Sequence, residues 1–282
     1  MKLFSIPSGN FKLDGGAMFG VVPKSIWSKI YPSDDNNMIP LSMRCLLVVD
    51  GERKVLIDNG IGNKQGNKFF GHYHLFGDEN LSGSLKQIGL TPADITDMFL
   101  THLHFDHAGG SINLRNDGTG FEPAFPNARY WVSNDHWNWA NNPNRREKAS
   151  FLKENIIPIL ESGQLNLFDA PFELLKGFQV KTYDGHTAGQ AIPFIKYKGR
   201  TIVYMADFIP TSAHVPLPYI MSYDTQPLKS LTEKEKFLEE AVDNSYILFF
   251  EHDAFSECCT LIRTEKGIKV NKKGTLEEFL AD

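Results

Sequence analysis

Residues 101–110 read THLHFDHAGG and directly follow the apolar run Met98-Phe99-Leu100. Three histidines and one aspartate therefore stand close together at the end of a strand that should be buried. Burying such polar groups is costly unless a cation pairs with them, and imidazole nitrogen and carboxylate oxygen are ligands that zinc and related divalent ions take. Since strand side chains alternate, the first two histidines can face the same way. The stretch predicts a metal centre whose first four ligands are His102, His104, Asp106 and His107.

Three later apolar runs end in the same manner. They close in Asp184-Gly185-His186, in Met205-Ala206-Asp207 and in Phe250-Glu251-His252, so each places one histidine or aspartate after a predicted strand. A catalytic zinc normally takes three protein groups and a water, so four ligands from the first stretch are too many for one ion. The enlarged set suits two metals a few ångströms apart that share one carboxylate.

The 282 residues show no linker or repeat that would split the chain. We therefore expect one domain over residues 1–282, with an N-terminal extension over 1–40 and a helical insertion over 133–162 near the active site. That insertion should break at Asn142-Pro143 and again near Pro158. Strands in both halves with helices between them predict two packed sheets with helices outside. The expected elements include a hairpin of 43–50 and 54–58, a strand over 128–133 and a helix over 231–242.

Composition excludes several classes of protein. The net charge of −5 gives no general basic footprint for nucleic acid. The sequence contains no run of 18 apolar residues, so no membrane span is predicted. The N-terminal segment lacks the apolar core of a signal peptide. Three cysteines, with Cys258 and Cys259 adjacent, do not form a disulfide framework and fit buried, reduced thiols. We expect a cytoplasmic protein with a small-molecule substrate and neither a nucleic-acid nor a membrane partner.

THLHFDHAGG resembles the HxHxDH motif of the metallo-β-lactamase superfamily. DGHTAGQ, YMAD and FFEH resemble that family's later motifs in the same order, and VLIDNG resembles its early Asp-containing strand end. The resemblance spans roughly residues 40–255. It implies an α/β fold, the αββα four-layer sandwich, with metals at one edge between two sheets. It also implies one metal on His102, His104 and His186, the other on Asp106, His107 and His252, and a bridging Asp207.

The activity implied by this resemblance is hydrolysis by a hydroxide held between two divalent ions. Zinc is the expected metal, although iron or manganese can occupy similar sites. Asp106 could orient the hydroxide as well as bind a metal. Asp58 should hydrogen-bond to a ligand from behind, and Asp184 could do the same for a ligand histidine.

Departures from other branches narrow the substrate. Glyoxalase II relatives carry a C-terminal helical domain, and class B β-lactamases lack the bridging aspartate. What remains resembles the lactonase and organophosphate-hydrolase-like branch, which includes the N-acyl-homoserine lactonases. A lactone or other small carboxylic ester is thus the expected substrate. The well-studied small lactonases have a tyrosine where this chain has Pro210, so His214 or Tyr223 would have to assist catalysis.

Alternatives remain open at this stage. Within the fold, the chain could hydrolyse phosphoesters or phosphotriesters; outside hydrolysis, it could be an iron-dependent redox enzyme or a non-catalytic ligand-binding member. His136 could pack in the core or contact substrate. His72 and His74 are interpreted as part of a loop that lines the cleft, or of the plain surface, rather than as a third metal site. The aromatic N-terminal segment, with Phe19, Val21, Val22 and Trp27, suggests a homodimer by resemblance to the lactonases.

Overall fold

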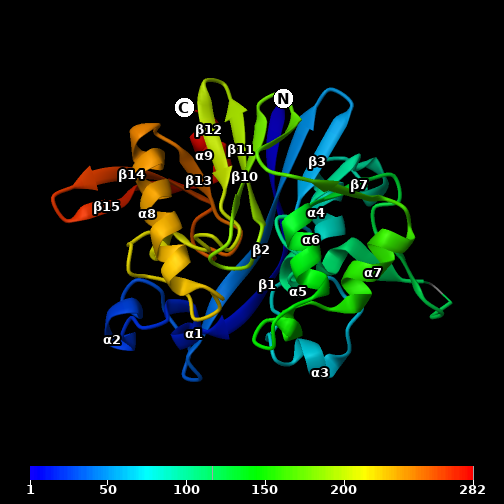
Figure 1. Ribbon diagram of the computed structural model, residues 1–282, viewed down its shortest axis with the longest axis horizontal. Coiled ribbons are helices and arrows are strands. Elements are labelled where there is room, and N and C mark those ends of the chain that lie inside the picture. The colour runs from blue at the N-terminus through cyan, green and yellow to red at the C-terminus, as the bar shows by residue number, and fades with distance from the viewer. Residues whose placement is uncertain (116, 282) are drawn as a thin grey trace. The chain divides into compact units, whose positions relative to one another are not determined.

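The computed structural model describes residues 1–115 and 117–281. The chain divides into two compact units, drawn in Figure 1 with colour running along the sequence. The first unit comprises residues 1–10 and 43–170, and the second comprises residues 11–42 and 171–282. Each unit contains strands of a large sheet together with helices, which confirms the mixed α/β class. The single domain expected over residues 1–282 stays a prediction.

The sheet of the first unit has the strand order β1-β2-β3-β4-β7-β8. Its β2 and β3 pair antiparallel across Gly51, which confirms the predicted hairpin, whereas β3, β4, β7 and β8 run parallel. Parallel neighbours end at the same edge of a sheet, so the segments that follow β3 and β4 come together. The strands are β1 (Lys2–Asp14), β2 (Met38–Asp50), β3 (Arg53–Ile57), β4 (Asp97–Phe99), β7 (Arg129–Ser133) and β8 (Leu165–Phe168).

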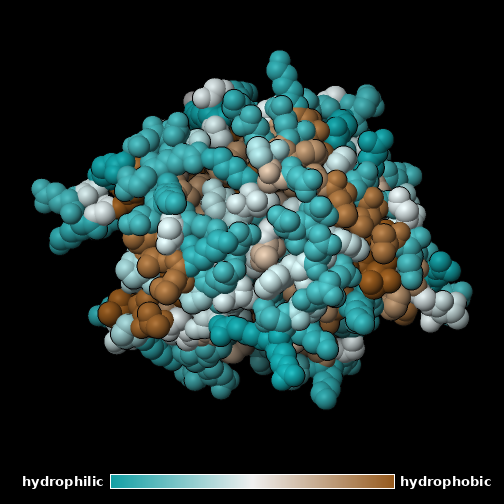
Figure 2. Space-filling model, in the orientation of Figure 1, coloured by the Kyte–Doolittle hydropathy of each residue, from teal (hydrophilic) through white to brown (hydrophobic). Residues whose placement is uncertain are grey.

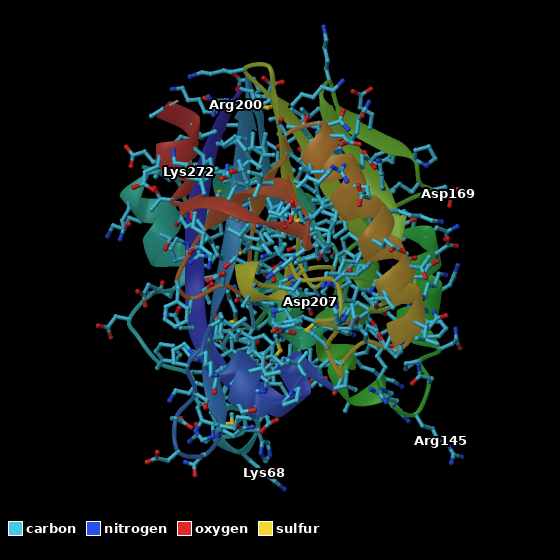
Figure 3. The ribbon with its side chains drawn as sticks, turned by 90° about the vertical axis from the view of Figure 1, so that its left-hand side faces the viewer. Lys68, Arg145, Asp169, Arg200, Asp207 and Lys272 are labelled. Carbon is cyan, nitrogen blue, oxygen red and sulfur yellow. The ribbon has the colours of Figure 1, made fainter. Side chains whose placement is uncertain are left out.

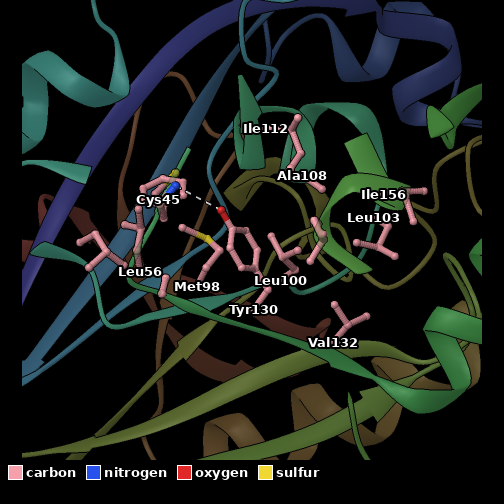
Figure 4. Close-up of a cluster of buried hydrophobic side chains, with 14 of the residues drawn as sticks. Cys45, Leu56, Met98, Leu100, Leu103, Ala108, Ile112, Tyr130, Val132 and Ile156 are labelled. Atoms are coloured by element: carbon pink, nitrogen blue, oxygen red, sulfur yellow. Dashed lines mark hydrogen bonds between the residues drawn. The ribbon is translucent and has the colours of Figure 1, made fainter. Parts of the chain in front are cut away.

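A buried apolar cluster joins this sheet to its helices (Figure 4). Leu56, Met98 and Val132 come from the strands, and Ala140 and Ile156 come from the insertion. Because the insertion supplies buried side chains, it is packed structure rather than a free loop. The helical segments are α3 (Asn67–Phe70), α4 (Leu81–Gln87), η1 (Pro92–Asp94), α5 (Phe105–Ala108), η2 (Gly109–Ser111), α6 (Asn134–Asn141), η3 (Lys148–Ser150) and α7 (Lys153–Glu161), and a small hairpin pairs β5 (Ile112–Leu114) with β6 (Phe121–Pro123).

The insertion follows the predicted pattern in one place and departs from it in another. Helix α6 ends before Asn142-Pro143, as expected. The break expected near Pro158 is wrong, because α7 continues through that residue to Glu161. Proline removes one intrahelical hydrogen bond, and the buried faces of Ile156 and Ile159 hold the short helix in place.

The second unit contains a seven-stranded sheet in the order β15-β14-β13-β12-β11-β10-β9. Strands β12 and β13 are parallel, and every other neighbouring pair is antiparallel. Alternation across β10, β11 and β12 makes β10, β12 and β13 point the same way, so all three end at one edge. The strands are β9 (Phe172–Leu175), β10 (Phe178–Tyr183), β11 (Gln190–Tyr197), β12 (Arg200–Tyr204), β13 (Ile247–Phe249), β14 (Cys258–Thr264) and β15 (Gly267–Gly274).

Helix α8 covers part of this sheet and confirms the helix predicted over 231–242. Its Phe237 ring lies 6.2 Å from the Phe194 ring of β11 and 5.2 Å from Phe208, centroid to centroid. Cys258 and Cys259 are buried thiols in β14, as expected. Across the described residues, the helices are all too short or too polar to span a bilayer. The helical segments are α1 (Gly15–Phe19), α2 (Lys24–Trp27), η4 (Ser212–His214), α8 (Pro227–Asp243) and α9 (Leu276–Ala281).

Candidate metal centre

The four ligand candidates of the first unit follow β4 within a tight turn. Asp106 and His107 lie on the single turn of α5. Two glycines then pass against the backbone after β3. A Cβ at Gly109 would lie 2.1 Å from the Ile61 carbonyl oxygen, and one at Gly110 would lie 2.3 Å from that of Asn59. Only glycine fits at this distance, so the motif is held against the segment that follows β3.

The hydrogen bonds around His102 and His104 fix which ring nitrogen of each histidine carries a proton and which can accept. Thr101 Oγ1 donates its proton to Asp58 Oδ2 at 2.7 Å, so it must accept from His102 Nδ1 at 3.1 Å. On the other ring, His104 Nε2 donates to Glu147 Oε1 at 2.9 Å. The remaining nitrogens, His102 Nε2 and His104 Nδ1, carry lone pairs and face each other at 3.0 Å.

Two lone pairs at that distance repel each other unless a positive charge lies between them. Both rings are buried, so water cannot easily relieve the repulsion. Zinc bonds to imidazole nitrogen are about 2.0–2.1 Å long, and two such bonds in a tetrahedron separate the nitrogens by about 3.4 Å. The pair therefore fits a divalent cation.

His107 is oriented by the predicted carboxylate. Its Nδ1 donates to Asp58 Oδ2 at 3.1 Å, which confirms Asp58 as a group that supports a ligand from behind. The Nε2 lone pair is then directed away from Asp58 and lies 3.7 Å from Asp106 Oδ2. Asp58 has a φ of +57°, an unfavourable conformation for a residue with a side chain. Such strain is typical of functional sites.

The second unit repeats this logic around one carboxylate, Asp207, which is labelled in Figure 3. Its Oδ2 lies 3.1 Å from His186 Nε2, and its Oδ1 lies 3.0 Å from His252 Nε2. The other nitrogen of each histidine is a donor: His186 Nδ1 to Asp224 Oδ1 at 3.0 Å, and His252 Nδ1 to the Ser42 carbonyl at 2.8 Å. Each oxygen of Asp207 thus faces one histidine nitrogen, the arrangement expected of a carboxylate shared by two cations.

The electrostatics around His186 also favour a cation beside Asp207. Burial lowers the pKa of His186, but the Asp207 and Asp224 carboxylates outweigh burial and raise the pKa to about 10. The surroundings therefore favour the proton on His186 that faces Asp207, and a bound metal ion would take the place of this proton. All seven predicted ligands are buried, and all belong to sets of histidines and acids that could hold a metal ion.

Sequence reasoning missed two of the supporting carboxylates and misplaced a third. Asp184 was expected to support a ligand histidine, but this is wrong: it accepts the Gly189 N–H and pairs with Lys229 Nζ at 2.6 Å. Asp224 supports His186 instead, and Glu147 supports His104. Neither stands next to a recognisable motif in the sequence.

The catalytic side chains proposed beyond the ligands have different surroundings. His214 is buried, its Nε2 donates to the Met18 carbonyl at 2.9 Å, and its Nδ1 accepts from Thr211 Oγ1 at 2.7 Å. Burial lowers the pKa of His214 to about 3, so the ring is neutral. Tyr223 is 41% exposed. Their roles in catalysis stay predictions.

The remaining candidates lie away from the ligands or serve structure. His136 is buried and its Nε2 accepts the Leu103 N–H at 2.8 Å, which is a structural role. His72 and His74 are exposed in a turn. In the N-terminal segment the Phe19 and Trp27 rings are buried and stacked at 5.0 Å, whereas Val21 is exposed. A homodimer through this segment stays a prediction.

Comparison with known proteins adds independent information. The family model described as the Metallo-beta-lactamase superfamily matches residues 40–252. A probable metal-dependent hydrolase from Staphylococcus aureus is 32% identical with a TM-score of 0.88, and the match covers 97% of this chain and 96% of that one. An N-acyl homoserine lactonase from Bacillus cereus is 24% identical, over 95% of this chain and 96% of the relative. The structure of AidC, a dizinc quorum-quenching lactonase, is 24% identical with a TM-score of 0.77, covers 95% of this chain and 93% of its own, and shares the fold.

Proposed function

The chain belongs to the metallo-β-lactamase superfamily and is a metal-dependent hydrolase, and we propose that it opens lactone rings. The observation that carries the lactone proposal is the likeness to the N-acyl homoserine lactonase of Bacillus cereus, which extends over 95% of this chain and 96% of the relative. A match over nearly the whole of both chains includes the segments around the ligands as well as the motif itself.

We further propose that two zinc ions bind, as the family's ligand order suggests. One zinc would be bound by His102, His104 and His186 and the other by Asp106, His107 and His252, with Asp207 shared. Support comes from each unit separately: facing lone pairs in the first unit, and a carboxylate between two histidine nitrogens in the second. When bound, such ions supply a Lewis acid for the carbonyl oxygen and lower the pKa of water towards neutrality.

The protein's own part in the reaction is to orient groups and to hold protons in place. Asp58, Glu147 and Asp224 each fix one ligand histidine in the tautomer whose free nitrogen can bind a metal. Asp106 is proposed to orient the attacking water as well as to bind a metal. Thr101 also donates to Asp58 and Trp139 also donates to Glu147, so these two carboxylates are held in place before substrate arrives.

An aromatic cluster beside Asp106 supports a substrate with an apolar chain. Phe105 precedes Asp106 directly, and its ring lies 5.3 Å from Phe69 and 4.5 Å from Tyr73. Burial and then the charge of Asp106 raise the pKa of Tyr73, so that hydroxyl lies within electrostatic reach of the carboxylate. Phe69 and Tyr73 remain partly exposed. We propose that this surface contacts the acyl group of the substrate.

Of the two side chains suggested to assist the leaving group, the surroundings favour Tyr223. Both ring nitrogens of His214 are engaged in hydrogen bonds, so the ring would have to break one of them to reach a substrate. Tyr223 is accessible and can donate its hydroxyl proton. A Tyr223→Phe variant should then lower kcat more than KM changes, whereas His214→Gln should mainly lower stability.

The direct test is proton release in a pH-stat by zinc-loaded protein. The substrates would be γ-butyrolactone, N-hexanoyl- and N-decanoyl-homoserine lactone, and one phosphotriester. We expect turnover of the acyl lactones, and a loss of kcat/KM of about 10³-fold in Asp106→Asn, because both a ligand and a water-orienting group are changed.

The matched control is Asp78→Asn, which removes the same charge from an exposed position of the first unit. Bound zinc is measured in every sample, so that loss of metal and loss of chemistry are distinguished. Absence of proton release from all lactones, with zinc bound, would overturn the lactone proposal. Turnover of the phosphotriester alone would identify the alternative activity within the fold.

A further inference from the structure

A cavity lies in the first unit, and none of the predicted ligand side chains lines it. It is bounded by α6, η3 and α7 and has a volume of about 600 Å³. Volumes of about 300–1,000 Å³ are typical of sites for small molecules. Its apolar walls include Phe151, Ile156 and Ile157. The lining also contains two lysines, Lys148 and Lys153, together with Ala140, Pro143 and the amide of Asn141.

The walls and the charged lining have different chemistry. Ala140, Phe151 and Ile156 are buried, so the inner walls belong to the packed interior of the unit. Apolar side chains gather near α7, seen as the brown area at the right of Figure 2. Leu160 of α7 is 51% exposed. A ligand with an aliphatic chain would therefore remove apolar surface from water on both sides of the contact.

The charge in this cavity is positive. Lys148 and Lys153 are exposed, and among the residues that the structure describes none of those lining the cavity is acidic. Glu147, which precedes Lys148 in the sequence, is not part of the lining; its buried carboxylate accepts hydrogen bonds from His104 Nε2 at 2.9 Å and from Trp139 Nε1 at 2.7 Å. The segment thus directs its acid inwards, towards a ligand histidine, and leaves its lysine at the cavity.

We propose that this cavity binds an aliphatic carboxylate, with the chain against Phe151 and Ile156 and the carboxylate beside Lys148 and Lys153. An aliphatic cation would meet two ammonium groups of its own sign. A sugar phosphate or nucleotide would leave polar groups without partners on the apolar walls. An anionic head on an apolar chain satisfies both parts of the lining.

The position of Phe151 connects this site to the metal ligands of the same unit. Its ring lies 4.9 Å from the His104 ring and 5.7 Å from the His136 ring, centroid to centroid. An occupant would therefore contact the residue that packs on His104. The source of the carboxylate rests on the proposed function: opening an acyl lactone yields an aliphatic carboxylate, and a free fatty acid is the other source with the same chemistry.

Calorimetric titration of the zinc-loaded protein tests the proposal. The probes are decanoate, decanesulfonate and decyltrimethylammonium, which share one chain length and differ in the head group. Sulfonate is a weaker base than carboxylate and a poor zinc ligand, so it reports on the cavity rather than on the metals. We expect both anions to bind and the cation to bind at least about tenfold more weakly.

Variants locate the binding. The double variant Lys148→Ala/Lys153→Ala should lower the affinity for decanesulfonate by about tenfold. Ile157→Trp should lower this affinity by at least as much, because the larger side chain fills the cavity. The control is Lys2→Ala/Lys86→Ala, which removes two exposed lysines of the first unit outside the cavity. Lactone turnover, measured separately, reports on folding and on the proposed function, so the two proposals fail independently.

Three results would overturn the site: no binding of either anion, equal binding of the cationic probe, or binding unchanged in both variants. Decanoate that binds while decanesulfonate does not would assign the carboxylate to the metals and also overturn it. Given binding in the cavity, N-decanoylhomoserine separates the two sources. Affinity equal to that of decanoate indicates the ring-opened product, and weaker affinity indicates a simple fatty acid.

Discussion

The two units arrange their predicted metal ligands in opposite ways. The first unit places His102, His104, Asp106 and His107 in a single turn after one strand, whereas the second collects His186, Asp207 and His252 from the ends of three strands. In the first unit local backbone geometry determines the arrangement. In the second, strand direction determines it, because β10, β12 and β13 end at one edge. The arrangement of the predicted ligands therefore depends on a turn in the first unit and on sheet topology in the second.

Both units nevertheless use distant carboxylates to orient their histidines. Glu147 stands 43 residues after His104, and Asp224 stands 38 residues after His186. The support is thus long-range even where the ligands are contiguous. This similarity suggests that the two halves respond alike to changes in support and differently to changes in the ligands themselves.

Replacing Asp207 should have the largest effect. It faces histidine nitrogens with both oxygens, so Asp207→Ala removes a group proposed to serve both zinc ions, whereas His102→Ala affects one. We expect kcat/KM to fall by about 10³-fold or more and bound zinc to fall below that of His102→Ala. Mass spectrometry of bound zinc and lactone kinetics measure both effects. Retention of two zinc ions with near-native activity would refute the shared role.

Removing the distant carboxylates should have an intermediate effect that is similar in the two units. Glu147→Ala and Asp224→Ala should each weaken zinc binding by about 10–100-fold, because the supported histidine loses its fixed orientation. Competition with a chromogenic chelator measures the affinity. The controls, Glu161→Ala and Asp243→Ala, remove exposed acids from the same units. A large loss in one unit with none in the other would show that the halves are not supported alike.

The smallest effect concerns one lysine in each unit, the half-buried Lys64 and the buried Lys234. Lys64 donates to the Gly109 carbonyl in the first, and Lys234 donates to the carbonyls of Pro216 and Tyr219, each at 2.9 Å, in the second. Burial lowers the pKa of Lys64 to about 8 and that of Lys234 to about 7, from an ordinary value of 10.5. Between each lowered value and 10.5 the unfolded chain binds more protons than the folded chain, so stability should rise with pH.

Melting temperatures at pH 7, 8.5 and 10 check this prediction. The gap is defined as the melting temperature of the wild type minus that of the variant. It should increase for Lys234→Met as the pH rises above about 7, and for Lys64→Met above about 8. Lys236→Met, which changes an exposed lysine of the same helix as Lys234, should show a constant gap. Gaps that stay constant for both Lys64 and Lys234 would contradict the lowered pKa values.

The sequence predicted the parts of this molecule that depend on near neighbours. The hairpin across Gly51 and helix α8 each follow from patterns within a few residues. Asp58 was also predictable, since it stands at the end of a strand that reads as buried.

What could not be predicted depends on tertiary packing. Glu147 and Asp224 are two of 34 acidic residues, and only the fold brings them against their histidines. Asp184 was chosen for its nearness in sequence to His186, but Lys229 of α8 competes for its carboxylate. The prediction of a helix break near Pro158 was wrong for a similar reason, because burial of α7 outweighs the lost hydrogen bond.

The glycine pair of the ligand turn also bears on how such a protein can change over generations. A Cβ at Gly109 or Gly110 would collide with the backbone at Ile61 or Asn59, so every missense substitution there should be selected against. Phe69 and Tyr73 are partly exposed and can be exchanged without moving that backbone. Adaptation to new substrates should therefore proceed through the aromatic segment, while the turn that carries the ligands is inherited unchanged.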